Sequence, residues 1–398
     1  MKLFVPKEAA PETRVAASPD TVKRLIALGF DVFIEKGAGE LSRVTDGAFE
    51  AAGAKIGNAK SGATADVVLK INRPSPAEAK SYKKGALVLA AMDPHGNLSD
   101  LKAMGTAGLS AFAMEFMPRI TRAQSMDILS SQANLAGYQA VIEGAAVFDR
   151  ALPMMMTAAG TVPAAKVFVM GAGVAGLQAI ATAKRLGAVV TATDVRAAAA
   201  EQVASLGGKF IMTDALKDAS GEGGYARELT KEEQKAQSEL VAAHISKQDI
   251  VITTALIPGR PAPRLVTKAM TDTMAPGAVV VDLAVERGGN VEGAQLGKVV
   301  KSGPVSIVGY ANMAGRIAAT ASQLFAKNLY TFLETMVDQK AGALAVNLED
   351  ELVKATLLTH GGKIVHPLFA ADEAKPAEKK LAAKKAVTKK TASKGESK

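Results

Sequence analysis

The sequence has no cysteine and no tryptophan, and aromatic residues make up only 4% of its 398 residues. Without cysteine, disulfides and thiol chemistry are excluded. No run of about 18 apolar residues occurs, and the apolar run at the N-terminus is too short for a signal peptide, so we expect no membrane-spanning segment. The 48% of hydrophobic residues instead favours about two closely packed α/β domains.

The net charge of +9 is unevenly distributed along the chain. The segment from Asp372 to Lys398 carries nine lysines against four acidic residues, which leaves only +4 for the rest. With no aromatic residues interleaved, this pattern does not indicate nucleic-acid binding. We expect 370–398 to be a disordered Ala/Lys-rich tail, either simply solvated or in contact with an acidic partner or an anionic membrane surface.

Short apolar runs alternate with helix-length segments, which predicts an α/β fold of two lobes. Each lobe is expected to be a mostly parallel sheet with helices on both faces. We assign 1–130 to the first lobe, completed by about 316–369, and 131–315 to the second. Strands are predicted at 3–5, 30–35, 66–70, 86–90, 109–114, 167–170, 188–193, 209–211, 250–254, 279–282 and 306–308, and a long amphipathic helix at 316–337.

The most specific stretch is 164–196, AAKVFVMGAGVAGLQAIATAKRLGAVVTATDVR. A predicted strand, a glycine-rich turn, a helix of small residues and a second strand follow in the order of the dinucleotide-binding fingerprint. Gly171 allows the tight turn, Gly173 lets the backbone approach a pyrophosphate, and Gly176 lets the helix pack on the strand. The second lobe is therefore predicted to be a Rossmann-type nucleotide-binding domain with phosphate at the helix N-terminus.

Asp194, at the end of the second strand of this stretch, indicates the cofactor. A carboxylate there accepts hydrogen bonds from the adenosine ribose of NAD and repels the 2′-phosphate of NADP. Asp194 could instead cap a following helix, and the nearby Arg196 weakens the argument against NADP slightly. NAD(H) is the predicted cofactor.

Acid–base catalysis has few candidates in this sequence. Of the four histidines, His244 is expected on a helix surface, and His360 and His366 lie near the end of the globular part. Only His95, after the 86–90 strand, is placed to face the cleft between the lobes. Lys70 could also face it, although a lysine at a strand end is usually solvated.

Two polar segments interrupt the α/β pattern. In 117–135, four residues could converge at the cleft rim and orient a nicotinamide without proton transfer: Arg119, Gln124, Asp127 and Ser130. The last three share one face if the segment is helical, although these residues could instead cap a helix starting near Asp127. The segment 214–238 is predicted to be a mobile loop, either functional or a passive insertion.

Four long motifs carry a family resemblance: VPKEAAPETRVAASP (5–19), MPRITRAQSMDILSSQANLAGY (117–138), TAAGTVPAAKVFVMGAGVAGLQAIATAKRLGA (157–188) and TTALIPGRPAP (253–263). Over nearly all of 1–369, the chain resembles the alanine dehydrogenase/transhydrogenase family. Two features depart from the family pattern: PKEAAPETR is one residue shorter than usual, and the Lys-rich tail is additional.

The resemblance implies which residues contact NAD(H). At the nicotinamide end these are Arg119, Gln124, Asp127 and Ser130, of which the first three are the predicted catalytic residues. Further contacts are implied around the glycine-rich turn and the ribose, from Val174, Ala175, Gly176, Asp194, Val195, Arg196, Gly224 and Leu256. Tyr225 would belong to a mobile loop that closes on the nucleotide, and no metal ligands are expected.

The family has two branches that differ in chemistry. Alanine dehydrogenases carry a lysine in a K-x-K-x-P-like strand end and a histidine in a Y-L-H-L-like strand, whereas this chain has Asn72 and Leu87–Met92 there. The difference favours the transhydrogenase branch, in which hydride passes directly between two nicotinamides and catalysis depends on positioning and exclusion of water. An amino-acid dehydrogenase and a non-catalytic NAD-sensing module remain alternatives.

The transhydrogenase branch also implies partners. They are a second copy of the chain in a homodimer, a subunit that binds NADP(H), and a membrane-spanning subunit that couples hydride transfer from NADH to NADP+ to proton translocation. The implied location is the cytoplasmic side of the inner membrane, to which the chain would be attached through these partner subunits.

Overall fold

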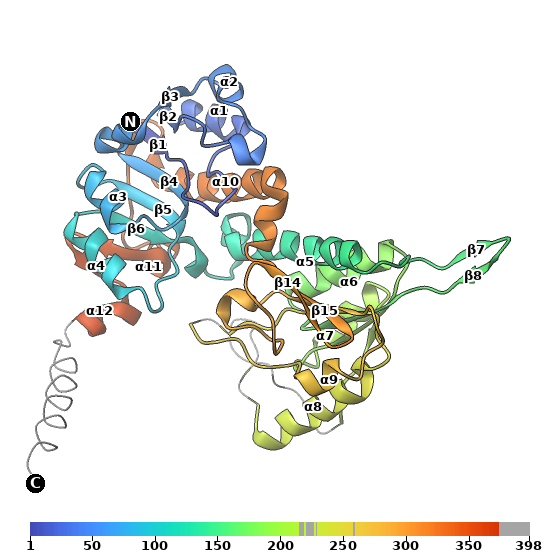
Figure 1. Cartoon of the computed structure of the whole chain (residues 1–398). Coiled ribbons are helices and arrows are strands. Elements are labelled where there is room, and N and C mark those ends of the chain that lie inside the picture. Colours follow the sequence, from blue (N-terminus) through green and yellow to red (C-terminus); the bar gives the residue numbers. More distant parts are fainter. Residues whose placement is uncertain (215–218, 220–226, 228, 258, 374–398) are drawn as a thin grey trace, which may run out of the picture.

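The computed structural model describes residues 1–214, 219, 227, 229–257 and 259–373. Two α/β lobes lie side by side, and two long helices join them, α5 (Ile128–Val147) and α10 (Ala318–Glu334) (Figure 1). Among the described residues, no helix is both long enough and apolar enough to cross a membrane.

The first lobe contains an eight-stranded sheet in the order β19-β18-β6-β5-β4-β1-β2-β3. Its strands are β1 (Lys2–Val5), β2 (Asp31–Glu35), β3 (Lys55–Gly57), β4 (Val67–Asn72), β5 (Leu87–Ala91), β6 (Ser110–Ala113), β18 (Leu357–His360) and β19 (Lys363–Ile364). The first six are parallel, whereas β18 runs antiparallel to β6 and β19 antiparallel to β18. The chain therefore returns to the first lobe after α10.

Helices cover both faces of this sheet because side chains alternate along each strand. Val67 and Leu69 of β4 pack with the layer of α1, α2 and α10, while Val68 packs with that of α3 and α4. The helices of this lobe, besides α10, are α1 (Pro19–Ala27), α2 (Asp46–Ala51), α3 (Pro76–Ser81), α4 (Leu98–Thr106), α11 (Glu351–Thr356) and α12 (Pro367–Glu373). A small two-stranded sheet, β16 (Val337–Asp338) and β17 (Ala343–Leu344), follows α10.

The second lobe contains a seven-stranded sheet in the order β11-β10-β9-β12-β13-β15-β14, parallel except for the edge strand β14. Its strands are β9 (Lys166–Met170), β10 (Val189–Thr193), β11 (Lys209–Phe210), β12 (Ile250–Thr253), β13 (Val279–Asp282), β14 (Lys298–Ser302) and β15 (Val305–Gly309). The order reverses between β9 and β12, which is the switch point of a Rossmann-type sheet.

Helices again pack on both faces of this second sheet. Val167 and Val169 of β9 pack with α5, α6 and α7, whereas Phe168 and Met170 pack with α8 and α9. These helices are α6 (Val174–Arg185), α7 (Ala199–Ser205), α8 (Lys231–Ile245) and α9 (Lys268–Thr271).

The predicted α/β fold with two mostly parallel sheets is confirmed, and every predicted strand lies within two residues of an observed one. The prediction of a loop through 238 is wrong from Lys231 onward. There α8 begins, because Thr230 and Glu233 form a reciprocal capping box. The predicted helix at 316–337 starts as a 3-10 turn, η7 (Met313–Ile317), before α10. The predicted tail overlaps α12 at 370–373, and 374–398 lies outside the described residues.

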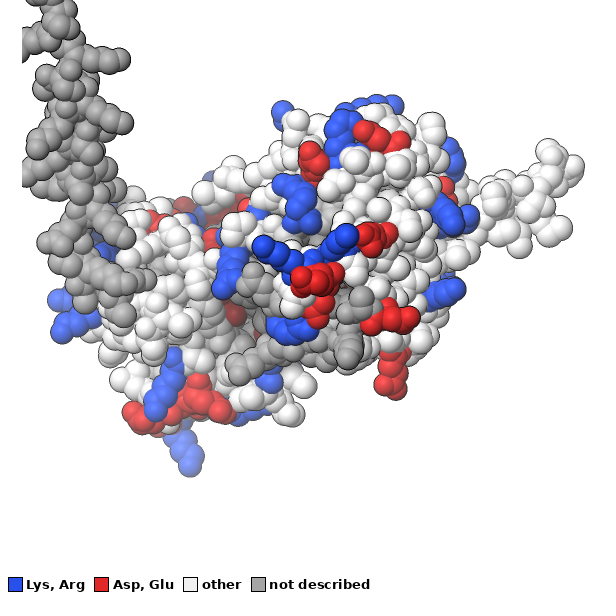
Figure 2. Space-filling model, turned by 90° about the horizontal axis from the view of Figure 1, so that it is seen from below, with Lys and Arg blue, Asp and Glu red and all other residues white. Residues whose placement is uncertain are grey.

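The hairpin of β7 (Met155–Thr157) and β8 (Gly160–Val162) was not predicted from the sequence. It projects away from the second lobe (Figure 1). The face of the molecule in Figure 2 carries acidic and basic side chains next to one another, whereas the projecting hairpin on the right shows neither.

Close packing of α5 on α6 depends on Gly137, because a Cβ atom at this position would collide with the backbone carbonyl of Ala175. We predict that Gly137→Ala lowers the free energy of unfolding by ~1–3 kcal/mol, as overpacking does elsewhere. Gly47→Ala, in the open helix α2 where a Cβ meets no atom within 4 Å, is the matched control and should be neutral or stabilising. Denaturant titration of both variants measures the difference, and equal stability of the two would contradict the packing argument.

Candidate functional site

The glycine-rich turn between β9 and α6 is held against two neighbouring strands. Gly171 has a φ of 102°, and a Cβ there would collide with the hydroxyl of Thr254. That hydroxyl donates to the Gly171 carbonyl at 3.1 Å, and the Gly171 N–H donates to the Thr193 carbonyl at 2.8 Å. Only glycine fits this position, both for its backbone conformation and for space.

The start of α6 lies directly on the glycine-rich turn. A Cβ at Gly176 would collide with the Gly171 carbonyl oxygen, so the helix rests directly on the turn. At Gly173, the N-cap, a Cβ would meet no atom of the described residues within 4 Å, and none of their side chains caps the helix. Among the described residues the first N–H groups of α6 therefore have no side-chain cap, which fits the binding of a dinucleotide pyrophosphate there.

Asp194 follows β10 directly and is 93% buried. Its Oδ2 accepts from the Ala172 N–H at 2.7 Å, and both of its oxygens accept from the Arg196 guanidinium at 2.8 Å. Burial alone would raise the pKa of Asp194, but the hydrogen bonds from Arg196 and Ala172 outweigh it and hold the pKa below its usual range. The carboxylate is thus ionised beside the turn, as ribose recognition requires.

The remaining residues predicted around the turn are partly described. Val174 and Leu256 are exposed apolar residues, and Leu256 comes two residues after Thr254, which bonds Gly171. Val195 accepts a hydrogen bond from the Ala219 N–H at 2.9 Å. The predicted contacts of Gly224 and Tyr225 fall on residues outside the described part of the chain.

The four polar residues predicted at the nicotinamide end line one pocket of about 200 Å³. They are Arg119, Gln124, Asp127 and Ser130, together with the apolar side chains of Pro118, Ile120 and Ala123. Ligand pockets usually measure roughly 300–1,000 Å³, so this one suits a part of a dinucleotide, such as its ring, rather than the whole.

Gln124, Asp127 and Ser130 do not share one helix. Gln124 lies on the 3-10 helix η4 (Thr121–Met126), and Asp127 is the N-cap of α5, with its Oδ1 accepting from the Ser130 N–H at 2.9 Å. The Ser130 hydroxyl donates to the other oxygen, Oδ2. Capping, the alternative expected from the sequence, is therefore present, and it orients both side chains toward the same pocket.

His95 does not line this pocket. Its ring packs edge-on against Phe116 and Phe369, with centroids 6.0 and 5.3 Å away, and it reaches the second lobe at Gly259. The other three histidines form hydrogen bonds elsewhere. His244, which is half-buried on α8, bonds Thr191 at 2.8 Å. His360 bonds Ser110 at 3.0 Å, and His366 bonds the Ala355 carbonyl at 3.2 Å.

The expectation that Lys70 is solvated is wrong, because its side chain is only 2% exposed. The register of β4 against β5 is irregular between Leu69 and Asn72, and such an irregularity redirects a side chain. Lys70 Nζ lies 2.9 Å from Glu78 and 3.3 Å from Glu8. A buried cation held by two carboxylates has a structural role.

A network around Glu12 was not predicted from the sequence. Glu12 accepts from Arg14 at 2.8 Å, from Asn312 at 3.0 Å and from Asn72 at 3.2 Å, and Arg14 donates onward to Gln132 of α5 at 2.8 Å. Asn72 therefore serves as a hydrogen-bond partner of Glu12. The network joins the N-terminal segment and β4 of the first lobe to α5 and the segment before α10.

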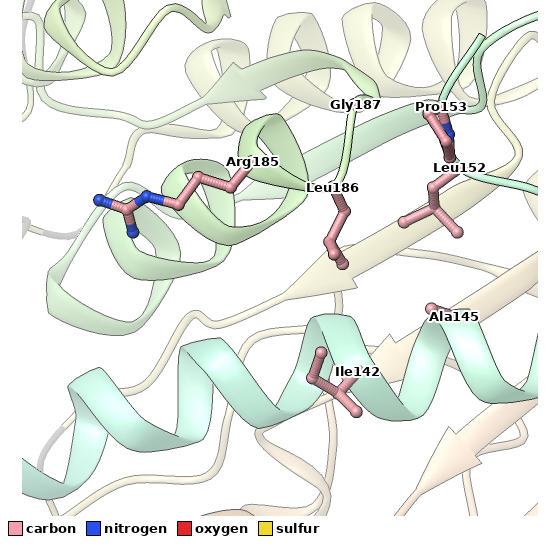
Figure 3. A pocket seen from close by; sticks show the side chains of 7 residues that line it. All are labelled: Ile142, Ala145, Leu152, Pro153, Arg185, Leu186 and Gly187. Carbon is pink, nitrogen blue, oxygen red and sulfur yellow. The ribbon is translucent and has the colours of Figure 1, made fainter. Parts of the chain in front are cut away.

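A second, larger pocket of about 590 Å³ lies apart from all the predicted site residues. Figure 3 shows apolar side chains of α5 facing those of the turn after α6 and of the segment that leads to the β7–β8 hairpin. The lining residues are Ile142, Ala145, Leu152, Pro153, Arg185, Leu186 and Gly187.

Known proteins resemble most of the chain. Models described as alanine dehydrogenase/PNT, N-terminal and C-terminal domain, match residues 4–136 and 140–367. A protein of Rhodospirillum rubrum, named as the first segment of NAD(P) transhydrogenase subunit alpha, is 55% identical over 92% of this chain and 98% of its own length.

Solved structures show the same relationship. A transhydrogenase from Sinorhizobium meliloti is 63% identical, with a TM-score of 0.82 over 92% of this chain and 100% of that chain. An L-alanine dehydrogenase is 26% identical, with a TM-score of 0.78 over 93% of this chain and 98% of that chain.

The Glu12 network predicts a specific dependence of stability on pH. Burial would raise the pKa of Glu12, but the bonds from Arg14 and Asn312 lower it from 4.5 to about 2. Because the folded pKa is the lower one, this stabilisation is present above pH 4.5 and is lost as the pH falls toward 2. The full loss amounts to roughly 3 kcal/mol, of which about 2 kcal/mol is lost by pH 3.

The measurement is urea unfolding from pH 7 to pH 3. Glu12→Gln should flatten the acid limb by about 2 kcal/mol over this range relative to the wild-type chain, whereas Glu50→Gln on exposed α2 should leave it unchanged. Parallel acid limbs for the wild-type chain and Glu12→Gln would refute the pKa assignment.

Proposed function

This chain belongs to the alanine dehydrogenase/PNT family, and we propose that it is the NAD(H)-binding subunit of a proton-translocating transhydrogenase. Its similarity to proteins named as transhydrogenases confirms the resemblance found in the sequence. In the proposed reaction, NADH on this chain passes hydride directly to NADP+ on a partner subunit.

The position of Asn72 favours this function over that of an alanine dehydrogenase. The alanine dehydrogenase branch carries a lysine in this motif and a histidine in the strand that follows it, which together anchor a carboxylate and exchange a proton. Here Asn72 donates to Glu12 at 3.2 Å, and His95 is packed among Phe116 and Phe369. A direct transfer between two nicotinamides needs neither group.

In the proposed mechanism, the residues of this chain bind NADH and orient its nicotinamide ring. The free N–H groups at the start of α6 bind the pyrophosphate, and Asp194 accepts from the adenosine ribose. Gln124 and Arg119 hold the nicotinamide end, while the Asp127–Ser130 pair, fixed by the N-cap of α5, sets the ring orientation. Bound NADH supplies the hydride, and the apolar side chains of the pocket exclude water.

The proposed assembly includes subunits that this chain does not contain. One binds NADP(H), and one spans the inner membrane and couples hydride transfer to proton translocation. The chain would sit on the cytoplasmic side of that membrane through these partners. The name of its Rhodospirillum rubrum relative, which describes one segment of one transhydrogenase subunit, supports this arrangement.

The test combines the purified chain with an NADP-binding transhydrogenase subunit and follows NADH oxidation. We expect oxidation that requires NADP+, and Gln124→Ala should slow it by about tenfold or more through misplacement of the ring, with a smaller effect on NADH affinity. Gln339→Ala, in an exposed turn, is the control.

Two outcomes would contradict the proposal. Oxidation of NADH by pyruvate and ammonia, without exchange to NADP+, would identify an amino-acid dehydrogenase. Tight NADH binding with neither reaction would identify an NAD-sensing module.

We also propose that the chain forms a homodimer through the β7–β8 hairpin. Met154, Met155 and Met156 at the hairpin are 57%, 40% and 81% exposed, and Figure 2 shows no charged residue on it. A lone two-stranded hairpin is marginally stable in water, and exposed methionines are typical of binding surfaces. The apolar pocket of Figure 3 lies at the hairpin base, so a twofold arrangement would let each hairpin pack on the other copy there.

Sedimentation or light scattering at micromolar concentration tests the dimer. The wild-type chain should have twice the monomer mass, and Met156→Glu should shift it toward the monomer because a charge would be buried in the interface. Leu296→Glu, at a residue that is 57% exposed elsewhere, should remain dimeric. A monomeric wild-type chain, or loss of the dimer in the Leu296 control as well, would count against the hairpin interface.

A further inference from the structure

Asn328 is a buried polar side chain of α10 that contacts both segments of the pocket proposed for the nicotinamide. Only 7% of Asn328 is exposed. Its Nδ2 donates to the Ser125 carbonyl at 2.8 Å, and its Oδ1 accepts from the Ser131 hydroxyl at 2.7 Å. Ser125 directly follows Gln124 on η4. Ser131 directly follows Ser130 on α5. One amide therefore joins the two segments that supply the polar residues of the pocket.

We propose that Asn328 is a positioning residue for hydride transfer, because it holds Gln124 in the orientation that the nicotinamide ring needs. This role rests on the proposed function of the chain and on the part that Gln124 has in it. Asn328 does not itself line the pocket, so it acts through the segments that it bonds.

The helix α10 is a rigid support for these two hydrogen bonds. Phe325, Leu329 and Phe332 of α10 are at most 1% exposed and belong to the core of the first lobe. Asn328 lies in the same stretch of helix, so the packing of its neighbours fixes its backbone. Because both polar atoms of its amide are engaged, the position of Ser125 is tied to the core of the first lobe.

The 3-10 helix η4 depends on such an outside contact more than an α-helix would. It has six residues, whereas 3-10 helices of more than about four residues are uncommon because their hydrogen-bond geometry is poorer. None of the described side chains caps its start. Carbonyls in the last turn of a helix lack partners within the helix, and Asn328 supplies the donor for the Ser125 carbonyl there.

The other contacts of the two segments differ in strength. The helix α5 has a second polar contact with α10, since Gln132 donates to the Ala321 carbonyl at 3.2 Å. On η4, Arg122 pairs with Asp350 at 2.8 Å, but 47% of the Arg122 side chain is exposed, and exposed ion pairs contribute little. Loss of the Asn328 amide should therefore displace η4 more than α5.

The experiment combines the purified full-length chain with an NADP-binding transhydrogenase subunit and measures the single-turnover rate of hydride transfer and the Kd for NADH. Asn328→Leu keeps a similar shape but removes both hydrogen bonds. Hydride transfer should slow by about tenfold or more, because the reacting atoms must lie within a narrow range of distances, with a smaller change in Kd. Ser131→Ala, which removes one of the two bonds that fix the amide, should slow it by a smaller factor.

A double-mutant cycle identifies the residue through which Asn328 acts. In the Gln124→Ala background, Asn328→Leu should slow hydride transfer further by less than about twofold, because no Gln124 side chain is left to misplace. A merely structural role would give the same reduction in both backgrounds.

Ser322→Ala is the matched control on the same helix. Ser322 is 1% exposed, and its hydroxyl bonds the Val15 N–H at 3.0 Å and the Ser42 hydroxyl at 2.8 Å, which do not line the pocket. Urea unfolding should show lower stability for both Ser322→Ala and Asn328→Leu. Only Asn328→Leu should lose hydride-transfer rate.

The outcomes separate the role of Asn328 from the proposed function. If the wild-type chain transfers hydride and Asn328→Leu does so equally fast, or if the two reductions add in the cycle, the positioning role is overturned while the transhydrogenase function stands. If Asn328→Leu does not fold, Ser131→Ala decides by the same cycle. If NADP+ does not oxidise the NADH bound to the wild-type chain, both proposals are overturned.

Discussion

The contact between Gly176 and the Gly171 carbonyl is the constraint on which the site depends. Because no side chain separates them, α6 begins directly on the turn after β9, and no side chain of the described residues caps its first N–H groups. The helix α5 packs equally closely on α6, because Gly137 of α5 lies against the backbone of Ala175. Asp127 caps the start of α5, so the polar pocket and the glycine-rich turn are positioned by a single stack of two helices on one sheet.

The two lobes are joined by polar contacts as well as by helices. Glu12 accepts hydrogen bonds from Arg14, Asn72 and Asn312. Arg287 of the second lobe forms an ion pair with Asp93 of the first at 2.7 Å. Charge-assisted bonds of this kind are directional, so they define how the lobes face one another. The proposed hydride transfer, which depends on positioning, would benefit from such a defined geometry.

Particular residues show why only some of this structure could be predicted. Most strands of both sheets could be predicted because apolar runs and glycine turns are local patterns, whereas β3, β14, β18 and β19 were not predicted. The burial of Lys70 could not be predicted, since it depends on an irregular register with β5 and on two glutamates from other segments. The hairpin at 155–162 has no strong turn motif, and its exposed methionines would be expected in a core. The partners of Glu12 include Asn72 and Asn312, which lie 60 and 300 residues away in the chain, and no spacing rule connects them.

The sequence by itself determined the α/β class, the glycine-rich turn with its acidic partner Asp194, and the set of polar residues near Asp127. These follow from backbone sterics and periodicity, which act over a few residues. Only the tertiary structure decided that Arg119, Gln124, Asp127 and Ser130 line one pocket, that Arg196 closes on Asp194, and that Asn72 binds Glu12. Such contacts depend on where separate segments meet in space, and this is set by the packing of whole helices and sheets.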